Sequence, residues 1–364
     1  MTGGFAARLE RIWYPEDGSG GEPSAALRAA AAALGLAARV RGRAFDRGLI
    51  TVRRLPVPCI SVGNLSVGGT GKTPLVAWLI EELSRLGARP AVVSRGYGGS
   101  TRGPARVPTA GDCDAARRFG DEPALLAERY RGVPVVVGRD RHAAGLIAAA
   151  TAGTTVVVAD DAFQHRRLAR DLDIVVLDAT RGLGNGRLLP AGPLREPPER
   201  LKRAGVIVLN RVSAASDLAG LRRTVVRLAP RAPIVETDLE FSGWRDALTG
   251  APAELPAGAG VYVFSGIANP GSFRRTLEGQ GLRVDGWEVF RDHHAYRPRE
   301  VERLGHAAES SGAAAAVTTA KDAVRIPAWS AGVPLYRAEV KLVMMRGRET
   351  LWELLRSIAA AGRG

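Results

Sequence analysis

The chain has 364 residues, of which 46% are hydrophobic and 24% charged, and its formal net charge is +14. This length and composition are typical of a globular protein of about two domains and exclude a disordered chain. No run of about 18 uncharged apolar residues occurs, so we expect no membrane-spanning helix. Two cysteines, Cys59 and Cys113, are too few for a disulfide framework or a cysteine zinc site, as is usual in a reducing cytosol.

The basic charge is carried almost entirely by arginine. Lysine occurs at only four positions, Lys72, Lys202, Lys321 and Lys341, among 51 basic residues. An excess of Arg, Ala and Gly is typical of a genomic bias, so part of the charge carries no functional information. The rest favours an anionic partner, which could be a nucleotide, a nucleic acid or a membrane surface.

The first 50 residues contain an Ala- and Leu-rich stretch, Ala25 to Val40, which favours a helix and is followed by Arg41, Arg43 and Arg47. Charged residues interrupt its apolar part, which argues against a cleavable signal peptide. A basic amphipathic helix that lies on an anionic membrane is one interpretation. A helix packed on the neighbouring domain is the other, and the residues alone leave both open.

Between residues 51 and 212, short apolar runs rich in β-branched residues alternate with helical stretches. The expected strands are Val57–Val62, Ala91–Ser94, Val133–Val137, Thr155–Ala159, Ile174–Leu177 and Val206–Leu209. Continuous apolar strands separated by helices predict a parallel sheet that is covered on both faces. Ligands of such sheets bind outside the carboxyl ends of the strands, so the residues that follow each strand are the first candidates for a site.

The first of these strands leads into a glycine-rich turn and then into a helix. The turn contains Gly68, Gly69, Thr70, Gly71, Lys72 and Thr73. A strand, a glycine-rich loop, Lys-Thr and a helix together predict a phosphate-binding loop, in which backbone N–H groups surround an anion at the helix N-terminus. Lys72 would reach the β- and γ-phosphates, and the Thr73 hydroxyl would bind Mg²⁺. Ser66 departs from the strict pattern, and an ordinary strand-to-helix turn is the alternative.

A pair of carboxylates, Asp160 and Asp161, follows the strand expected at Thr155–Ala159. An acidic residue at the end of a buried strand suits a Mg²⁺ site beside the phosphate loop. Asp178 follows the next strand and competes for this role. We favour the pair, because two carboxylates at one strand end are costly to place without a cation, although solvated loop acids remain the alternative. The sequence does not separate the duties of the two residues.

Three further polar positions have both a functional and a structural interpretation. Asp121 precedes a helical run, so it could cap that helix or accept a proton from a substrate hydroxyl, and spacing alone favours the cap. Arg95 opens a cationic, glycine-rich loop at the expected ligand edge, or simply a turn. Arg195 lies in the long loop 182–200 and could bind a phosphate or be a surface arginine.

The rest of the chain predicts a connecting region at 213–257 and a second, smaller α/β lobe at 258–364. Asn210-Arg211-Val212-Ser213 departs twice from the Asn-Lys-x-Asp pattern of guanine-specific loops, which argues against a GTPase. His293 and His294 lack a third ligand at a suitable spacing, so we expect no histidine metal site.

Several of these stretches, in this order over about residues 55–325, resemble the tetraacyldisaccharide 4′-kinase family, the lipid A 4′-kinases. The residues that carry the resemblance are Gly63–Pro74, Ser94–Gly98, Gly120–Pro123, Asp160–His165, Leu189–Glu196, Asp292-His293 and Thr319–Ala323. The fold expected for the chain is α/β: a P-loop NTPase-like parallel sheet with helices on both faces, plus the smaller lobe. Its parts would be a basic helical segment at 1–50, a kinase core at 51–212, the connecting region and the second lobe with a C-terminal helix.

The resemblance implies an ATP- and Mg²⁺-dependent kinase that phosphorylates the 4′-hydroxyl of a tetraacylated glucosamine disaccharide 1-phosphate. It implies that Asp121 is the base, that His293 from the second lobe is its partner, and that substrate contacts come from Arg95, Gln164, His165 and Arg195. It also makes the N-terminal helix a membrane-surface anchor at the cytoplasmic face of the inner membrane. It implies no nucleic-acid partner and no obligate protein partner. Ala162 stands where the family usually has glycine, and a left-handed conformation there would strain the loop.

The competing hypothesis is a P-loop ATPase or GTPase switch that binds nucleic acid or a protein partner. Partition-type ATPases of this kind carry a signature lysine directly before the Gly-Gly of the loop. Val67 occupies that position here, which counts against the switch.

Overall fold

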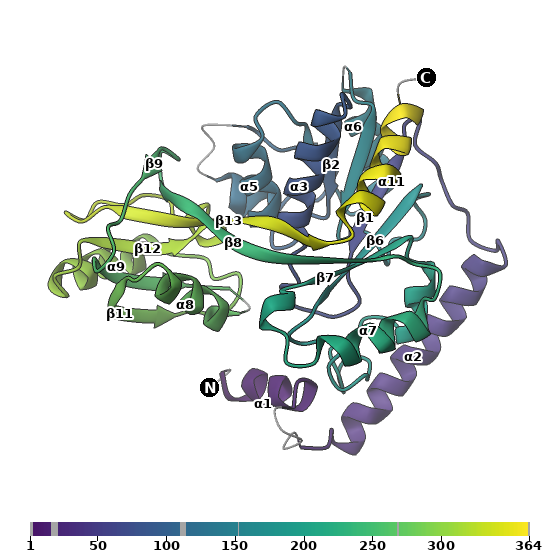
Figure 1. Ribbon diagram of the computed structural model, residues 1–364, viewed down its shortest axis with the longest axis horizontal. Coiled ribbons are helices and arrows are strands. Elements are labelled where there is room, and N and C mark those ends of the chain that lie inside the picture. Colours follow the sequence, from purple (N-terminus) through teal and green to yellow (C-terminus); the bar gives the residue numbers. More distant parts are fainter. Residues whose placement is uncertain (1–2, 16–20, 110–113, 152, 268, 363–364) are drawn as a thin grey trace. The chain divides into compact units, whose positions relative to one another are not determined.

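The computed structural model describes residues 3–15, 21–109, 114–151, 153–267 and 269–362 (Figure 1). Cys113 lies outside these residues. The chain forms two compact units: unit 1 contains Met1–Ala91, Ala149–Asp238 and Val343–Gly364, and unit 2 contains Val92–Ala148 and Leu239–Leu342. Residues 92–148 therefore group with the second lobe and not with the phosphate-binding loop. The segment boundaries predicted above stay a prediction, since a compact unit is not in itself an independently folding domain.

Unit 1 is built on a parallel sheet. Its strands are β1 (Cys59–Gly63), β5 (Val156–Asp160), β6 (Leu172–Asp178), β7 (Val206–Asn210) and the start of β8 (Ile234–Asp246). They lie in the order β8-β7-β6-β1-β5, and all neighbouring pairs are parallel. Every residue of β1, β5 and β7 is buried. The structure thus confirms the parallel, doubly covered sheet that the apolar runs predict.

Helices cover both faces of this sheet (Figure 1). The helices of unit 1 are α1 (Gly3–Trp13), α2 (Ala25–Asp46), α3 (Lys72–Arg85), α7 (Leu218–Leu228) and α11 (Arg348–Ala361), with 3₁₀ turns η1 (Pro198–Arg203) and η2 (Val212–Ala214). Helices α3 and α11 pack together on one face. On the other face, α7 and η1 pack on a core that includes Leu65, Phe163 and Val175. In the described part of the chain, no helix combines the length and hydropathy that crossing a bilayer requires.

Unit 2 contains two sets of strands. In the first set, β2 (Pro90–Ser94) and β4 (Val135–Val137) are parallel, and β3 (Ala105–Arg106) is antiparallel to β4. The helices of this part are α4 (Ala115–Phe119), α5 (Asp121–Arg129) and α6 (Arg141–Ala150). Strand β2 begins in unit 1 and α6 ends there.

The second set of strands in unit 2 is β10 (Gly260–Ser265), β11 (Arg283–Val289), β12 (Ala315–Thr319) and β13 (Leu335–Arg346), in the parallel order β11-β10-β12-β13. The helices are α8 (Pro270–Gly279), α9 (Pro298–Ser310) and α10 (Ala320–Ala323), and β9 (Pro252–Ala253) pairs antiparallel with β8. Two apolar clusters, centred on Phe264 and Val263, form the core here. Strands β8 and β13 run from one unit into the other.

Candidate active site

The phosphate-binding loop in unit 1 connects β1 to α3 and is held in place by hydrogen bonds from two asparagines. Gly71, the N-cap of α3, has φ +92°, and a Cβ there would lie 2.2 Å from Asn210 Nδ2, so only glycine fits. Asn210 Nδ2 donates to Thr70 O at 3.1 Å, and Asn64 Nδ2 donates to Thr70 Oγ1 at 3.2 Å. The first turn of α3 therefore begins at a fixed loop with its N–H groups directed outward from the helix N-terminus.

Lys72, Asp161 and Arg195, three of the residues predicted for the site, form one charge cluster. Lys72 Nζ lies 3.4 Å from Asp161 Oδ1, and Arg195 Nη1 donates to both Asp161 oxygens at 2.9 and 3.0 Å. Asp161 has φ +48°, a left-handed conformation that is uncommon for a residue other than glycine. Its carboxylate thus keeps the lysine of the loop and the arginine of the long loop together.

Asp160 and Thr73 are two of the three residues predicted to hold Mg²⁺, with Asp161. Asp160 is the last residue of β5 and is 1% exposed, and Thr73 is the second residue of α3. Among the residues that the structure describes, no group of three His, Cys, Asp or Glu side chains could hold a metal. Mg²⁺ usually takes one or two carboxylates and completes its shell with hydroxyl, phosphate and water oxygens, and a carboxylate and a threonine hydroxyl belong to that donor set.

Asp178, the competing carboxylate, is already engaged by protein groups. Its Oδ1 accepts from the Thr180 N–H at 3.0 Å and from the Thr180 hydroxyl at 2.7 Å, and its Oδ2 is paired with Arg211. These bonds satisfy the carboxylate without a metal. Asp161 is engaged in the same way, by Lys72 and Arg195, so the choice of Asp160 and Asp161 over Asp178 stays a prediction.

Asn210 and Arg211 brace the phosphate-binding loop, a role that the sequence did not reveal. Arg211 has φ +61°, and its Nη1 donates to Gly69 O at 3.0 Å while it also pairs with Asp178. Asn210 is fully buried and accepts from the Thr237 hydroxyl at 3.1 Å in addition to its bond to Thr70. The only signal in the sequence is that both residues end a strand at the ligand edge of a parallel sheet.

The turn after Asp161 is held by the backbone. Ala162 is fully buried, donates its N–H to Val62 O at 3.2 Å, and does not adopt a left-handed conformation. The strain that was expected if Ala162 were left-handed is thus absent, and the left-handed residue is Asp161. Gln164 Nε2 donates to Asn64 O at 2.8 Å, which ties this turn to the end of β1, and His165 is half-buried beside it.

In unit 2, Asp121 and His293 lie in contact. Asp121 is the first residue of α5, but Gly120 is the N-cap and no side chain caps the helix, so the favoured capping interpretation of Asp121 is wrong. Instead, Asp121 Oδ2 lies 3.1 Å from His293 Nδ1. Gly120 has φ +92°, and a Cβ there would lie 2.6 Å from Tyr97 O, so glycine permits this close approach.

Two cationic side chains, Arg325 and Lys321, also surround Asp121, which is 5% exposed. Arg325 forms a short ion pair with its Oδ2, and Lys321 Nζ lies 3.7 Å away. Burial raises the pKa of this carboxyl, but the hydrogen bond from His293 and the charges of Lys321 and Arg325 outweigh it and hold the pKa well below its usual range. Asp121 is therefore an ionised hydrogen-bond acceptor at neutral pH.

Lys321 balances the acidic side of this cluster. Its Nζ lies 3.3 Å from Glu122 and 3.8 Å from Asp292. Burial lowers the pKa of Lys321, but these carboxylates and Asp121 outweigh it and the net shift is upward. Arg325 was missed by sequence reasoning; its only signal is its position three residues after Asp322 in the Thr319–Ala323 motif. Arg95 is exposed at the end of β2.

Comparison with known proteins decides the family. Residues 23–359 match the sequence model of a family described as "Tetraacyldisaccharide-1-P 4'-kinase". This chain belongs to the tetraacyldisaccharide-1-P 4′-kinase family. It is thus a member of a family of phosphotransferases, and the resemblance drawn from its motifs is confirmed.

Individual relatives agree with this placement over nearly the whole chain. A tetraacyldisaccharide 4′-kinase of Anaeromyxobacter sp. (strain Fw109-5) is 43% identical over 370 residues, 97% of each chain. One from Chromobacterium violaceum is 42% identical over 87% of each. Among solved structures, LpxK from Aquifex aeolicus in complex with ATP matches with a TM-score of 0.71 and 30% identity, over 90% of this chain and 96% of that one.

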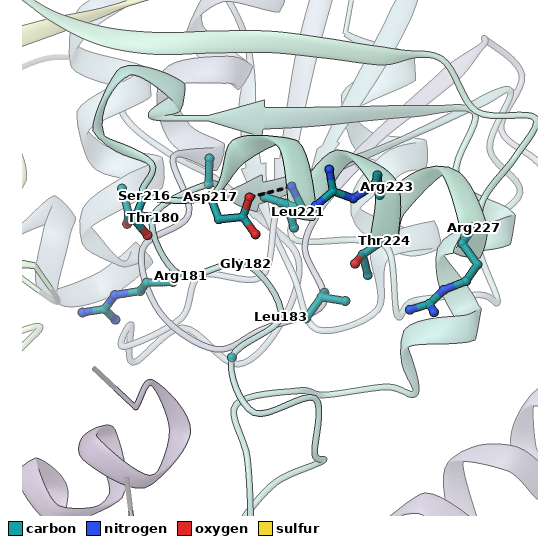
Figure 2. Close-up of a pocket in the computed structure, with 13 residues that line it drawn as sticks. Thr180, Arg181, Gly182, Leu183, Ser216, Asp217, Leu221, Arg223, Thr224 and Arg227 are labelled. Carbon is teal, nitrogen blue, oxygen red and sulfur yellow. Dashed lines mark hydrogen bonds between the residues drawn. The ribbon is translucent and has the colours of Figure 1, made fainter. Parts of the chain in front are cut away.

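A pocket of about 670 Å³ lies in unit 1. It lies between the loop after β6 and helix α7, and Arg181, Leu221, Arg223 and Arg227 are among its lining residues (Figure 2). Asp217, also at its wall, caps α7 by accepting from the Gly220 N–H at 2.7 Å. None of the predicted site residues lines this pocket.

Proposed function

We propose that this member of the family transfers the γ-phosphoryl group of ATP to the 4′-hydroxyl of a tetraacylated glucosamine disaccharide 1-phosphate. The observation that carries the proposal is the Asp121–His293 pair, a buried ionised carboxylate joined to an imidazole, in a chain that also has a phosphate-binding loop. The names of the relatives describe this kinase, and the solved LpxK structure from Aquifex aeolicus is of a complex with ATP.

The nucleotide would be held by unit 1. N–H groups of the loop and the N-terminus of α3 would surround the phosphates, and Lys72 would neutralise charge on the transferring group. Thr73 and Asp160 would hold Mg²⁺, which would neutralise phosphate charge. Asp161 then has a different duty, because its carboxylate is occupied by Lys72 and Arg195 and positions both.

The acceptor hydroxyl would be activated by Asp121. A carboxylate with a depressed pKa is a weak base, but phosphoryl transfer passes through a loose transition state in which the hydroxyl proton becomes acidic only as the new P–O bond forms. Asp121 can accept the proton at that stage, and the bond from His293 Nδ1 fixes the orientation of the carboxylate. Arg95, Gln164, His165 and Arg195 stay candidates for contacts to the acceptor.

The test is transfer of labelled phosphate from ATP to the tetraacylated disaccharide 1-phosphate in detergent micelles. We expect transfer by the wild type, none to an acceptor that lacks the 4′-hydroxyl, and a loss of at least about 100-fold in Lys72→Ala, which removes charge stabilisation of the transition state. Absence of transfer, with ATP hydrolysis that DNA or a protein partner stimulates, would contradict the proposal and support the nucleotide switch.

We also infer that the protein acts at the cytoplasmic face of the inner membrane, with helix α2 on the bilayer surface. Three large apolar side chains of this helix are exposed: Leu34 at 41%, Leu36 at 57% and Val40 at 57%. Arg39 and Arg43 are exposed on the same helix. A helix that offers both apolar and basic side chains to solvent is suited to the interface of an anionic bilayer.

The opposite side of α2 packs on the rest of unit 1, so the orientation of its exposed side chains is fixed. Ala31, Gly35, Gly42 and Phe45 are its buried residues. Near its C-terminal end, Arg166 donates to Gly42 O at 3.0 Å and to Asp46 at 2.7 Å, and its guanidinium lies 4.8 Å from the centre of the Phe45 ring. The helix is thus fixed to unit 1 while it presents the exposed side chains to a membrane.

Flotation with vesicles tests this inference. The wild type should float with vesicles that contain anionic phospholipid and much less with neutral ones, and Arg39→Glu/Arg43→Glu should reduce flotation several-fold, since each basic residue contributes about 1 kcal/mol near an anionic surface. Arg223→Glu/Arg227→Glu, the same change of charge on exposed residues of α7, is the matched control and should float like the wild type. Equal flotation of both double variants and the wild type would refute the role of α2.

A further inference from the structure

Arg325 lies in the turn directly after α10 in unit 2 and contacts the Asp121–His293 pair on two sides. Its Nη2 binds the Asp121 carboxylate. Its Nη1 donates to Gly266 O at 3.2 Å and lies 3.4 Å from His294 O. The arginine side chain is 8% exposed, so these contacts are made away from bulk water.

The two carbonyl groups belong to the backbone that shapes the His293 turn. His293 has φ +59°, and its N–H donates to Gly266 O at 3.2 Å, the same oxygen that Arg325 binds. Left-handed geometry costs energy at a residue with a side chain, so this turn requires support from its surroundings. Arg325 supplies part of that support by binding the carbonyl oxygens of Gly266 and His294.

Asp322 also binds the guanidinium of Arg325. Its Oδ1 lies 3.2 Å from Arg325 Nη1 and also accepts from the Gly266 N–H and the Tyr296 hydroxyl, each at 3.0 Å. Its Oδ2 accepts from the Thr319 hydroxyl at 2.6 Å. Because Asp322 is fully buried and hydrogen-bonded on both oxygens, it is a rigid anchor for Arg325.

We propose that Arg325 is a positioning residue for phosphoryl transfer: it binds the carboxylate of Asp121 and the backbone of the His293 turn at once, and so fixes the two groups against each other. The planar guanidinium suits this role because its donors point in several fixed directions, whereas an ammonium group has a single centre. This inference rests on the proposed function, in which Asp121 accepts the proton of the 4′-hydroxyl.

Separate effects on kcat and on KM distinguish positioning from mere folding. The ionisable or charged groups that face Asp121 are His293, Lys321 and Arg325, with Glu122 beside it on α5. Asp292, Asp322, Tyr97 and Tyr296 lie one contact further away. Among the groups that face Asp121, Arg325 contributes a permanent positive charge. Its removal should raise the pKa of Asp121, but because that pKa lies well below its usual range, Asp121 should stay ionised above pH 5 and kcat should fall by the same factor at every pH from 5 to 9.

The experiment compares Arg325→Gln, Arg325→Lys and Arg337→Gln with the wild type in the micelle assay between pH 5 and 9. Arg337 is the matched control, a buried arginine of the same unit that is paired with Glu128 and Glu339 instead of with Asp121 or His293. We expect Arg325→Gln to lose about 10- to 100-fold in kcat at every pH of this range, with KM for ATP unchanged. Arg325→Lys should recover part of kcat. Arg337→Gln should lower the melting temperature only.

A normal kcat in Arg325→Gln, or changes no different from those of Arg337→Gln, would overturn the proposal. If Arg325→Gln does not fold, Arg325→Lys decides, because wild-type kcat in that variant would show that the bridging geometry is not needed. A wild type that transfers no phosphate would instead overturn the proposed function, and this inference would fall with it; the two failures are therefore distinguishable.

Discussion

Asp121 shows how burial and charge together set the state of one side chain. Burial alone would favour the protonated form, but a hydrogen bond from His293 and the charges of Lys321 and Arg325 favour the anion more strongly. The result is a carboxylate that stays ionised across the range in which a cell operates. Such a group can hold a substrate hydroxyl by accepting its hydrogen bond before any proton moves.

The depressed pKa of Asp121 predicts that the contribution of this residue to stability depends on pH. A carboxyl whose folded-state pKa lies below its unfolded value of about 3.9 stabilises the fold above that pH, and the contribution is lost as the pH falls through the folded-state pKa. Asp121→Asn should therefore lower the free energy of unfolding at pH 7, by about 3 kcal/mol because buried cations lose their partner. Thermal unfolding of both proteins should show the difference shrinking below about pH 4. A difference that stays constant down to pH 3 would contradict the assignment.

Secondary-structure elements show where sequence reasoning succeeded and where it could not. Strands β1, β5 and β7 were predictable because they are buried throughout and read as continuous apolar runs. Strands β8 and β13 were missed because their second halves are mostly half-buried or exposed and contain charged residues. The region of β8 was therefore taken for a connection.

The site was predictable to the extent that its residues follow strands in recognisable motifs. Lys72, Asp161 and Arg195 form one cluster. Asp121 contacts His293, but this pairing was expected from the family resemblance and not from the spacing of the residues. Contacts made by residues without a motif, such as Asn210 to Thr70, depend on which strands become neighbours. That information arises only when the sheet has formed.

The hydrogen bond from Asn210, at the end of β7, to Thr70 in the phosphate-binding loop leads to a prediction about ATP binding. Asn210→Ala removes the buried bond to Thr70 O, so the loop should lose its fixed shape and KM for ATP should rise about tenfold, equivalent to about 1.4 kcal/mol. Asn269→Ala, which removes the N-cap of α8, is the matched control: it should cost about 1 kcal/mol of stability and leave KM for ATP unchanged. Equal KM values in the two variants would show that the brace does not serve the nucleotide.

For the whole molecule, the two units hold different parts of the chemistry. The phosphate-binding loop, Lys72 and the carboxylates proposed for Mg²⁺ belong to unit 1, whereas Asp121, His293 and Arg325 belong to unit 2. Under the proposed function, binding of ATP and activation of the acceptor hydroxyl are therefore separable properties of one chain. Loss of the Asp121 carboxylate in unit 2 should therefore abolish phosphoryl transfer and leave the affinity for ATP unchanged.

The most direct test of this claim measures ATP affinity and lipid phosphorylation in the same preparation of Asp121→Asn, below its melting temperature. We predict an ATP affinity within about twofold of the wild type and a kcat for transfer reduced by roughly 100-fold or more, because the proton of the 4′-hydroxyl has lost its acceptor. Wild-type turnover in the folded, ATP-binding variant would contradict the role of Asp121 and with it the proposed mechanism.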